Sequence, residues 1–186
     1  MIVRLVGSEM CIRDSDRLHA ADHQQTITTV AGDMVDDMPS GPFDVVLIGF
    51  NPLFNLETQQ RQQACLNACS QARTPDGIVV IEGLTPPQQP DGGMVDDISI
   101  RSMTATHVVL SISRHHGADQ LLEGQFIEFS KEQGVRLRPW SIRYATIDQL
   151  DAMATAAGLE VTARFNDASR SGFDPASVRH LTVYSC

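Results

Sequence analysis

The stretch "FDVVLIGFN" at residues 43–51 decides the fold. Its apolar run is almost unbroken, which is typical of a strand buried on both faces, as in parallel sheets. A second run of this kind, "GIVVIEGL", follows at residues 77–84. Residues 56–72 between them predict a helix, because several apolar side chains fall on part of one face. These side chains are Leu56, Cys65, Leu66 and Cys69. A strand, a helix and a strand with short connections predict a βαβ unit with a parallel sheet and a right-handed crossover.

Further α/β elements flank this unit. Residues 26–31 are rich in β-branched side chains and predict a strand that runs into a Gly-Asp turn. Residues 146–158 predict a helix that Thr146 caps, with acidic residues in its first turn and a glycine at its end. Residues 159–165 and 180–185 predict the last two strands.

The pattern between these parts is different. Four segments alternate apolar and polar residues, which predicts antiparallel strands with one face in solvent. They are residues 97–103, 107–114, 121–129 and 135–144. We therefore expect an antiparallel β layer inserted over about residues 95–144, as estimated from this alternation. Trp140 is expected to be buried within it.

Composition excludes several classes of protein. The net charge of −9 disfavours a general binder of nucleic acid or of an anionic membrane. No apolar run approaches the ~20 residues that a transmembrane helix needs. Cys65 and Cys69 lie one helical turn apart and are predicted to be core thiols, not zinc ligands. His115 and His116 are adjacent, so they point opposite ways on a strand, and we expect a solvated turn there and no metal site. Nothing requires an oxidising compartment, which favours the cytoplasm.

The N-terminal stretch "LVGSEMCIRDS", residues 5–15, has no helical or strand periodicity. It resembles a translated sequencing-library adapter. Residues 1–15 are therefore interpreted as a probable non-biological leader, and residues 16–186 as a partial domain. An ordinary variable N-terminus is the alternative interpretation.

Five strings occur in an order and at a spacing that resemble the class I S-adenosylmethionine-dependent methyltransferases. They resemble most the small-molecule branch with an antiparallel insertion before the last helix, as in sugar N-methyltransferases. The strings are "VAGDM" (30–34), "FDVVLIGFNPLFNL" (43–56), "TPDGIVVIEGLTP" (74–86), "IRYATIDQLDAMATAAGLE" (142–160) and "SVRHLTVYS" (177–185).

The resemblance implies a seven-stranded Rossmann-like sheet in the order 3-2-1-4-5-7-6, with the last strand antiparallel. Residues 26–31, 43–50 and 77–84 would be strands 3, 4 and 5, and the last two predicted strands would be strands 6 and 7. Strands 1 and 2 have no counterpart, so we expect the methyltransferase sheet to lack its first two strands. The glycine-rich cofactor loop belongs to the missing part. We therefore expect this chain to bind the cofactor negligibly and to be inactive, and we expect residues 2–6 to pair as a makeshift strand.

The resemblance also implies a cofactor site. The carboxylate of Asp33 would accept a hydrogen bond from the adenine amino group, and Met34 would offer its backbone N–H and its side chain to the ring. Asp33 capping its own turn is the alternative. Phe50 and Asn51 would line the methionine end of the cofactor, at the carboxyl edge of the sheet. The family often has threonine where Pro52 stands, which puts a hydroxyl contact there in doubt.

For the residues expected to contact the acceptor, each functional interpretation has a structural alternative. Phe54 would form a wall of the acceptor cleft, with core packing as the alternative. Glu82 ends a strand and would hold a cationic or hydroxyl-bearing acceptor or act as a base, with a solvated loop-edge residue as the alternative. Arg143 and Tyr144 would touch the acceptor where the insertion meets the last helix, with sheet-to-helix packing as the alternative.

Three functions follow from these observations. The first is methyl transfer from S-adenosylmethionine to an oxygen or nitrogen of a small-molecule acceptor, by an enzyme for which a homodimer is one assembly to test. The second is a non-catalytic methyltransferase-like subunit that uses the insertion to bind a partner or a second copy. The third, a nicotinamide-dependent reductase, is disfavoured because the sequence has no G-x-G-x-x-G motif.

Overall fold

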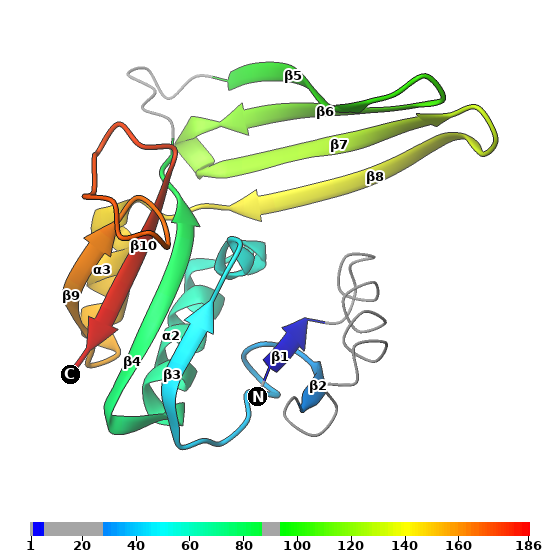
Figure 1. The fold of residues 1–186 in the computed structure, drawn as a ribbon. Coiled ribbons are helices and arrows are strands. Elements are labelled where there is room, and N and C mark those ends of the chain that lie inside the picture. The colour runs from blue at the N-terminus through cyan, green and yellow to red at the C-terminus, as the bar shows by residue number, and fades with distance from the viewer. Residues whose placement is uncertain (1, 6–27, 87–93) are drawn as a thin grey trace.

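The computed structural model describes residues 2–5, 28–86 and 94–186 (Figure 1). Its elements are, in chain order, β1 (Ile2–Leu5), β2 (Thr29–Gly32), β3 (Phe43–Ile48), the 3-10 helix η2 (Pro52–Asn55), α2 (Gln59–Ala72), β4 (Arg73–Leu84), β5 (Met94–Met103), β6 (His107–His116), the 3-10 helix η3 (Gly117–Asp119), β7 (Leu121–Ser130), β8 (Gly134–Arg143), α3 (Ile147–Ala156), β9 (Glu160–Phe165) and β10 (Arg179–Ser185). Most of the adapter-like stretch lies outside the described residues, as do residues 26 and 27 of the first predicted strand.

The central sheet has four strands in the order β3-β4-β10-β9. β3 and β4 are parallel, and α2 connects them, so the predicted βαβ unit is confirmed. β10 is antiparallel to both β4 and β9. The predicted order of strands 4, 5, 7 and 6, with the last strand reversed, is therefore also confirmed. β4 begins at Arg73, four residues before the predicted start at residue 77.

One face of this sheet carries the core. In Figure 1, α2 and α3 both lie behind the sheet. The thiols of Cys65 and Cys69 on α2 are fully buried, as predicted from their spacing. α3 starts at the predicted cap: the Thr146 side chain accepts from the Gln149 backbone, and the Gln149 side chain accepts from the Thr146 backbone. This capping box fixes the point at which the chain leaves the inserted layer and enters the core.

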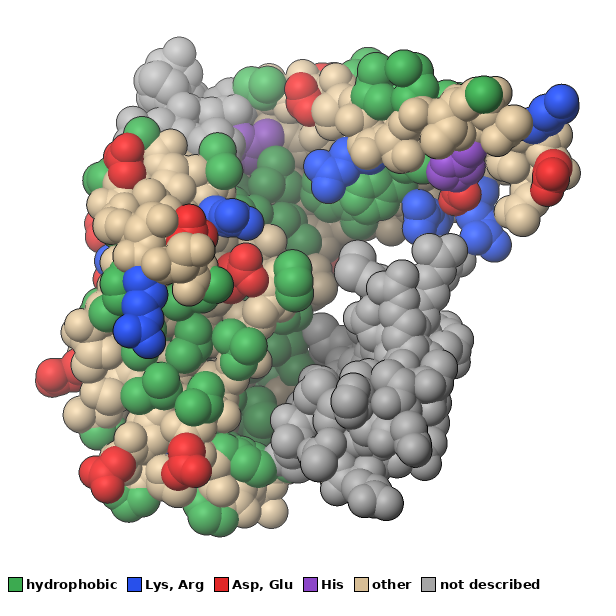
Figure 2. All heavy atoms as spheres, in the orientation of Figure 1, with side chains coloured by type: hydrophobic (Ala, Val, Ile, Leu, Met, Phe, Trp, Pro, Cys, Tyr) green, Lys and Arg blue, Asp and Glu red, His purple; other side chains and the backbone are tan. Residues whose placement is uncertain are grey.

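The other face of the sheet differs from the prediction. Val45 and Leu47 of β3 are 56% and 64% exposed, so the expected burial of this strand on both faces is wrong for the part of the chain that the structure describes. The physical reason is that both helices cover the same side of the sheet (Figure 1). Figure 2 shows hydrophobic side chains gathered on the uncovered near face.

β2 does not join the central sheet. It pairs in parallel with β1, with Ile2 opposite Thr29 and Leu5 opposite Gly32. The predicted makeshift pairing of the first residues is thereby confirmed over Ile2–Leu5. Within the described residues, β2 and β3 do not pair, which agrees with a sheet that lacks the two strands expected between them.

The inserted layer is an antiparallel sheet in the order β5-β6-β7-β8, as the alternation predicted. In Figure 1 it extends over the carboxyl end of β4, and β8 leads back toward α3. Its inner face contains the buried side chains of Val109, Ser111 and His115, and it meets the core at Leu122 and Ile142. Trp140, predicted to be buried, is half-buried. Among the described residues, no helix combines the length and apolarity needed to cross a membrane.

We define the outer face of the layer by its exposed apolar side chains. These are Ile98, Ile100, Met103, Phe129, Val135 and Leu137. They belong to one face because the register pairs Ile98 with Ile112, and the neighbouring pairs continue across β7 and β8. The side chains that alternate with them lie on the inner face.

The position of His115 corrects a prediction. The sequence predicted a solvated turn at His115 and His116, but both residues belong to β6. His115 lies on the inner face and is 5% exposed. His116 points the opposite way and contacts Glu123 at 3.0 Å. The expectation that the two rings diverge was right, and the expectation of solvent around His115 was wrong.

Candidate functional site

A strained turn follows β3 at the carboxyl edge of the central sheet. Phe50 and Asn51 both have left-handed backbone conformations, with φ of 66° and 63°. A bulky residue such as phenylalanine rarely adopts this region. Backbone strain of this kind concentrates at binding and catalytic sites, where the surrounding structure holds it in place. Phe50 is 88% exposed, so this turn presents an aromatic ring to solvent.

Glu82, at the end of the neighbouring strand β4, holds this turn. Its Oε2 accepts a hydrogen bond from the Phe50 backbone N–H at 3.0 Å. Its backbone carbonyl accepts from the Asn51 N–H at 3.3 Å. Two successive N–H groups of the turn are therefore fixed by one residue. The structure thus brings together Phe50, Asn51 and Glu82, three residues that the sequence placed in the site.

Asn51 has a polar atom that fits a ligand. Its Oδ1 is buried, and it has no hydrogen-bond partner among the residues that the structure describes. An unpaired buried acceptor is costly, so such atoms often mark a place where a ligand or water donates. The oxygen lies on the turn that is expected to line the methionine end of the cofactor.

Phe54 and Leu53 of η2 are each only 1% exposed and belong to the hydrophobic core. The arrangement matches the core-packing alternative for Phe54. A Cβ atom added at Gly83 would lie 3.5 Å from the Phe54 ring, so the ring packs tightly beneath the edge of β4. A contact between Phe54 and an acceptor stays a prediction.

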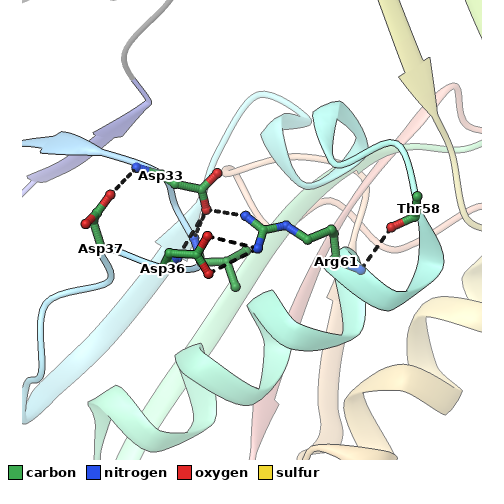
Figure 3. Close-up of polar contacts among 6 residues, drawn as sticks. Asp33, Asp36, Asp37, Thr58 and Arg61 are labelled. Carbon is green, nitrogen blue, oxygen red and sulfur yellow. Dashed lines mark hydrogen bonds and ion pairs between the residues drawn. The ribbon is translucent and has the colours of Figure 1, made fainter.

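Asp33 lies in the turn that follows β2 (Figure 3). Its Oδ1 accepts from the backbone N–H groups of Val35 at 2.8 Å and Asp36 at 3.1 Å. Asp33 therefore does cap its own turn. These two N–H groups, followed by the charge of Arg61, hold the pKa of the Asp33 carboxyl below its ordinary value. The carboxylate is ionised near neutral pH and is a strong acceptor. Met34 is 7% exposed, with its side chain in the core.

Arg61 of α2 joins the Asp33 turn to the helix. Its Nη2 donates to Asp33 Oδ1 at 2.6 Å, and its Nη1 donates to both carboxylate oxygens of Asp36, at 3.0 and 3.1 Å (Figure 3). The chain runs from the end of β3 through the Phe50–Asn51 turn and η2 to the start of α2. The ion pair therefore brings the predicted adenine turn to the same edge as the predicted methionine end.

Gln62, the next residue of α2, reaches the inserted layer. It is fully buried, and its Nε2 donates to the carbonyls of Leu56 at 3.0 Å and Arg143 at 2.7 Å. The Arg143 guanidinium in turn donates to the Gln120 side chain at 3.3 Å. The first turn of α2 thus connects the Asp33 turn, η2 and the end of β8.

Tyr144 forms a buried pair with His115. The Tyr144 hydroxyl lies 2.7 Å from Nε2 of His115, and the two rings meet edge to face. Burial lowers the pKa of His115 and raises the pKa of Tyr144, so both groups are neutral near pH 7. Tyr144 is 5% exposed, which fits the sheet-to-helix packing alternative. Its contact with an acceptor stays a prediction.

Sequence reasoning missed Arg61, Gln62 and the buried role of His115. Arg61 and Gln62 stand in a polar run, "TQQRQQ", that looks like a solvated helix face. Only the Thr58 cap before them marked this turn as the start of the helix. Their partners are 28 and 81 residues away in the chain, so no local pattern reports these contacts.

Within the described residues, no group of histidine, cysteine, aspartate or glutamate side chains is arranged to hold a metal ion. Three side chains at the edge of the sheet carry oxygen atoms that accept hydrogen bonds. They are the carboxylate of Asp33, the amide oxygen of Asn51 and the carboxylate of Glu82. Such a set suits an organic ligand with donor groups at two ends.

Solved structures similar to this chain include methyltransferases. No protein-family model and no curated protein sequence matches the chain. The CcbJ methyltransferase from Streptomyces caelestis is 29% identical, with a TM-score of 0.87 over 99% of this chain and 74% of its own. An S-adenosylmethionine-dependent methyltransferase from Clostridium acetobutylicum has a TM-score of 0.77 at 9% identity, over 98% and 74% of the two chains.

A third structure is CalS10, an aminopentose methyltransferase from Micromonospora echinaspora. It is 21% identical and has a TM-score of 0.61 over 98% of this chain and 72% of its own. The sheet order, the inserted layer and these likenesses agree with the resemblance carried by the sequence strings. The chain therefore has the fold of class I S-adenosylmethionine-dependent methyltransferases, and its 29% identity to the CcbJ enzyme agrees with the resemblance.

Proposed function

We propose that this chain carries the site for methyl transfer from S-adenosylmethionine to a nitrogen or oxygen atom of a small-molecule acceptor. The observation that carries the proposal is the Arg61 ion pair, because it brings the Asp33 turn to the edge where Glu82 holds the strained Phe50–Asn51 turn. One elongated cofactor can then contact both turns. Structures of similar fold include an aminopentose methyltransferase, which supports a small acceptor.

The described residues fit the two ends of this cofactor. The ionised carboxylate of Asp33 would accept from the adenine amino group. The unpartnered Oδ1 of Asn51 would accept from the ammonium group of the methionine end, and the exposed Phe50 ring would cover that end. When bound, S-adenosylmethionine supplies a methyl group on a good sulfonium leaving group. The protein then mainly has to position two reactants.

We propose that Glu82 binds the acceptor in addition to holding the Phe50–Asn51 turn. Only its Oε2 is used by the Phe50 N–H, so its second carboxylate oxygen would hold a cationic or hydroxyl-bearing acceptor or take its proton. Arg143 and Tyr144 would approach the acceptor from the inserted layer. The Gln62 contact fixes the carbonyl of Arg143 and so the end of this layer.

The cofactor site is testable by titrating ¹⁵N-labelled chain with S-adenosylhomocysteine, the demethylated product of the cofactor. We expect amide resonances of Asp33–Asp36 and Phe50–Asn51 to shift together with one dissociation constant. We expect that constant to be weaker than micromolar.

The matched control is Asp33→Asn. It keeps the size of the side chain but removes the charge that the adenine amino group would contact, so it should weaken binding about tenfold, as loss of a hydrogen bond to a charged group does. If millimolar S-adenosylhomocysteine shifts neither turn, or shifts only one, the proposed cofactor site is wrong.

We also propose that the outer face of the inserted layer forms a homodimer. Four ten-residue strands give a face of about 19 by 33 Å, or about 600 Å², from the usual strand spacing and rise. A standard interface buries about 800 Å² per partner. Exposed apolar side chains that gather on one face often mark a protein–protein contact. A hollow of about 580 Å³ opens beside the Asp96–Arg114 ion pair on the same face. We propose a second copy as the occupant, because about 600 Å² is at the lower end of what one partner buries in a stable interface.

Leu137→Glu should convert the dimer to a monomer, because it places a charge at a position that is 61% exposed on this face. The measurement is sedimentation velocity at tens of micromolar. Val178→Glu is the control, since Val178 is 80% exposed but lies outside the inserted layer, and it should leave the dimer intact. A monomeric parent chain, or a Leu137→Glu variant that still dimerises, would contradict the proposal.

A further inference from the structure

Arg61 bridges two carboxylates of the turn that follows β2. One planar guanidinium spans two carboxylates: Nη2 binds Asp33 and Nη1 binds both oxygens of Asp36 (Figure 3). A guanidinium presents its N–H groups in a fixed fork, so two simultaneous partners fix its orientation as well as its position. Each of the two carboxylates is then fixed in return.

The contacts to Asp33 all fall on one of its two oxygens. Within the described residues, Oδ1 receives the N–H groups of Val35 and Asp36 and the Nη2 of Arg61. Oδ2 is left to accept from a ligand. Three donors on one oxygen also fix the plane of the carboxylate, because rotation about its bond to Cβ would break all three contacts.

The backbone on both sides of this contact is held independently. The Thr58 hydroxyl accepts from the Arg61 backbone N–H at 3.2 Å and caps α2. On the other side, Asp37 Oδ2 accepts from the Asp33 backbone N–H at 2.7 Å (Figure 3). The Arg61 side chain is 38% exposed, so it does not fill the core. Its contacts position a carboxylate and do not support packing.

We propose that Arg61 is a positioning residue for cofactor recognition, and this inference rests on the proposed function of Asp33. By occupying Oδ1, Arg61 directs Oδ2 toward the 6-amino group of adenine and sets the preference of the site for adenosine over inosine. Inosine carries a carbonyl oxygen in place of that amino group. A fixed carboxylate repels this oxygen, whereas a freely rotating carboxylate can turn away and admit either base.

The experiment titrates the full chain with adenosine and with inosine at millimolar concentrations and follows the amide resonances of residues 33–36. We expect the parent chain to prefer adenosine about tenfold, the effect of one hydrogen bond to a charged group. Arg61→Met keeps the length of the side chain and removes the fork. Its preference should fall to within about twofold, because the freed carboxylate holds adenosine less well and can turn away from the carbonyl oxygen of inosine, which then binds more tightly.

Two further variants separate positioning from a general loss of charge or helix stability. Asp36→Asn removes the charge of Asp36 but keeps an amide oxygen that accepts from Arg61 Nη1, so the bridge and the contact to Asp33 persist and the preference should remain about tenfold. Thr58→Ala weakens the start of α2 without touching the carboxylate, and it should also keep the preference. Arg61→Lys can reach Asp33 with one point charge but cannot bridge both carboxylates, so it should restore part of the preference.

The outcomes separate this inference from the proposed function. If Arg61→Met retains the full preference in a chain whose spectrum stays folded, Arg61 does not position Asp33 and the inference is wrong. In that case Asp33→Asn still tests the proposed cofactor site by itself. If neither nucleoside shifts residues 33–36 of the parent chain, the proposed function fails and the inference fails with it.

Discussion

Replacing Phe54 by alanine is expected to lower the free energy of unfolding by about 3–5 kcal/mol, the usual effect of deleting a buried phenylalanine ring. The ring is 1% exposed and packs in the core cluster with η2, α2 and β4. The alanine would leave a cavity beneath the edge of the sheet, which rigid neighbours such as the Gly83 backbone cannot fill. Urea unfolding followed by far-ultraviolet circular dichroism measures the change.

Leu47→Ala is the matched control, because Leu47 is 64% exposed on the uncovered face of the sheet. Its effect should stay within about 0.5 kcal/mol, as for most surface substitutions. A Phe54→Ala chain as stable as its parent would contradict the core assignment. It would then favour the alternative in which this ring forms a wall of the acceptor cleft.

The second large effect is a loss of stability in acid that depends on His180. This side chain is 1% exposed, and its Nδ1 lies 2.9 Å from the Thr182 hydroxyl. Burial, and then the positive charge of Arg164, lower the pKa of His180 to about 4. The unfolded chain takes up this proton near pH 6.5. Between these two values the unfolded state holds more protons, so stability falls as the pH is lowered from about 6.5 to about 4.

The loss attributable to His180 should reach about 3 kcal/mol, from the size of the shift and the free energy of one pKa unit. Other acidic groups also contribute to acid unfolding, so the measurement is a difference. His180→Gln cannot take up the proton but keeps a hydrogen-bonding side chain for Thr182. Its stability should fall by about 3 kcal/mol less than that of the parent chain over the same interval. Equal losses in the two chains would contradict a neutral, buried His180.

The parts of the fold that sequence predicted correctly are those with a local periodic signal. The apolar runs at residues 43–51 and 77–84 identified β3 and β4, and the alternation over residues 97–144 identified the four strands of the insertion. The Thr146 cap marked the start of α3 within one residue. In each case the evidence lies within about one element, as side-chain periods of 2 and 3.6 require.

Local periodicity could not report which face of an element is covered. The run at residues 43–51 is apolar on both faces, and only the positions of α2 and α3 behind the sheet leave Val45 and Leu47 exposed. The same limit applies to His115, which looks like part of a polar turn. It is buried because the register of β6 places it on the inner face beside Tyr144.

In the candidate site, too, sequence identified the residues with a local signal and missed those that act through long-range contacts. Asp33, Phe50 and Asn51 follow strands and Glu82 lies near the end of one, and the resemblance to the methyltransferase strings singled these residues out. Arg61 and Gln62 act through contacts that close long loops of chain, and their own surroundings in sequence are polar and featureless. No single-sequence pattern predicts such a contact, because both partners are ordinary surface residue types until the fold brings them together.

A crystal structure of the chain grown in excess S-adenosylhomocysteine would show whether one molecule spans both turns. We expect its adenine amino group to lie within hydrogen-bonding distance of the Asp33 carboxylate, about 2.7–3.2 Å. We expect its amino-acid end to lie beside Asn51. If the adenine lies away from Asp33, or the two turns bind separate molecules, the assignment of this edge of the sheet as a methyl-donor site is wrong.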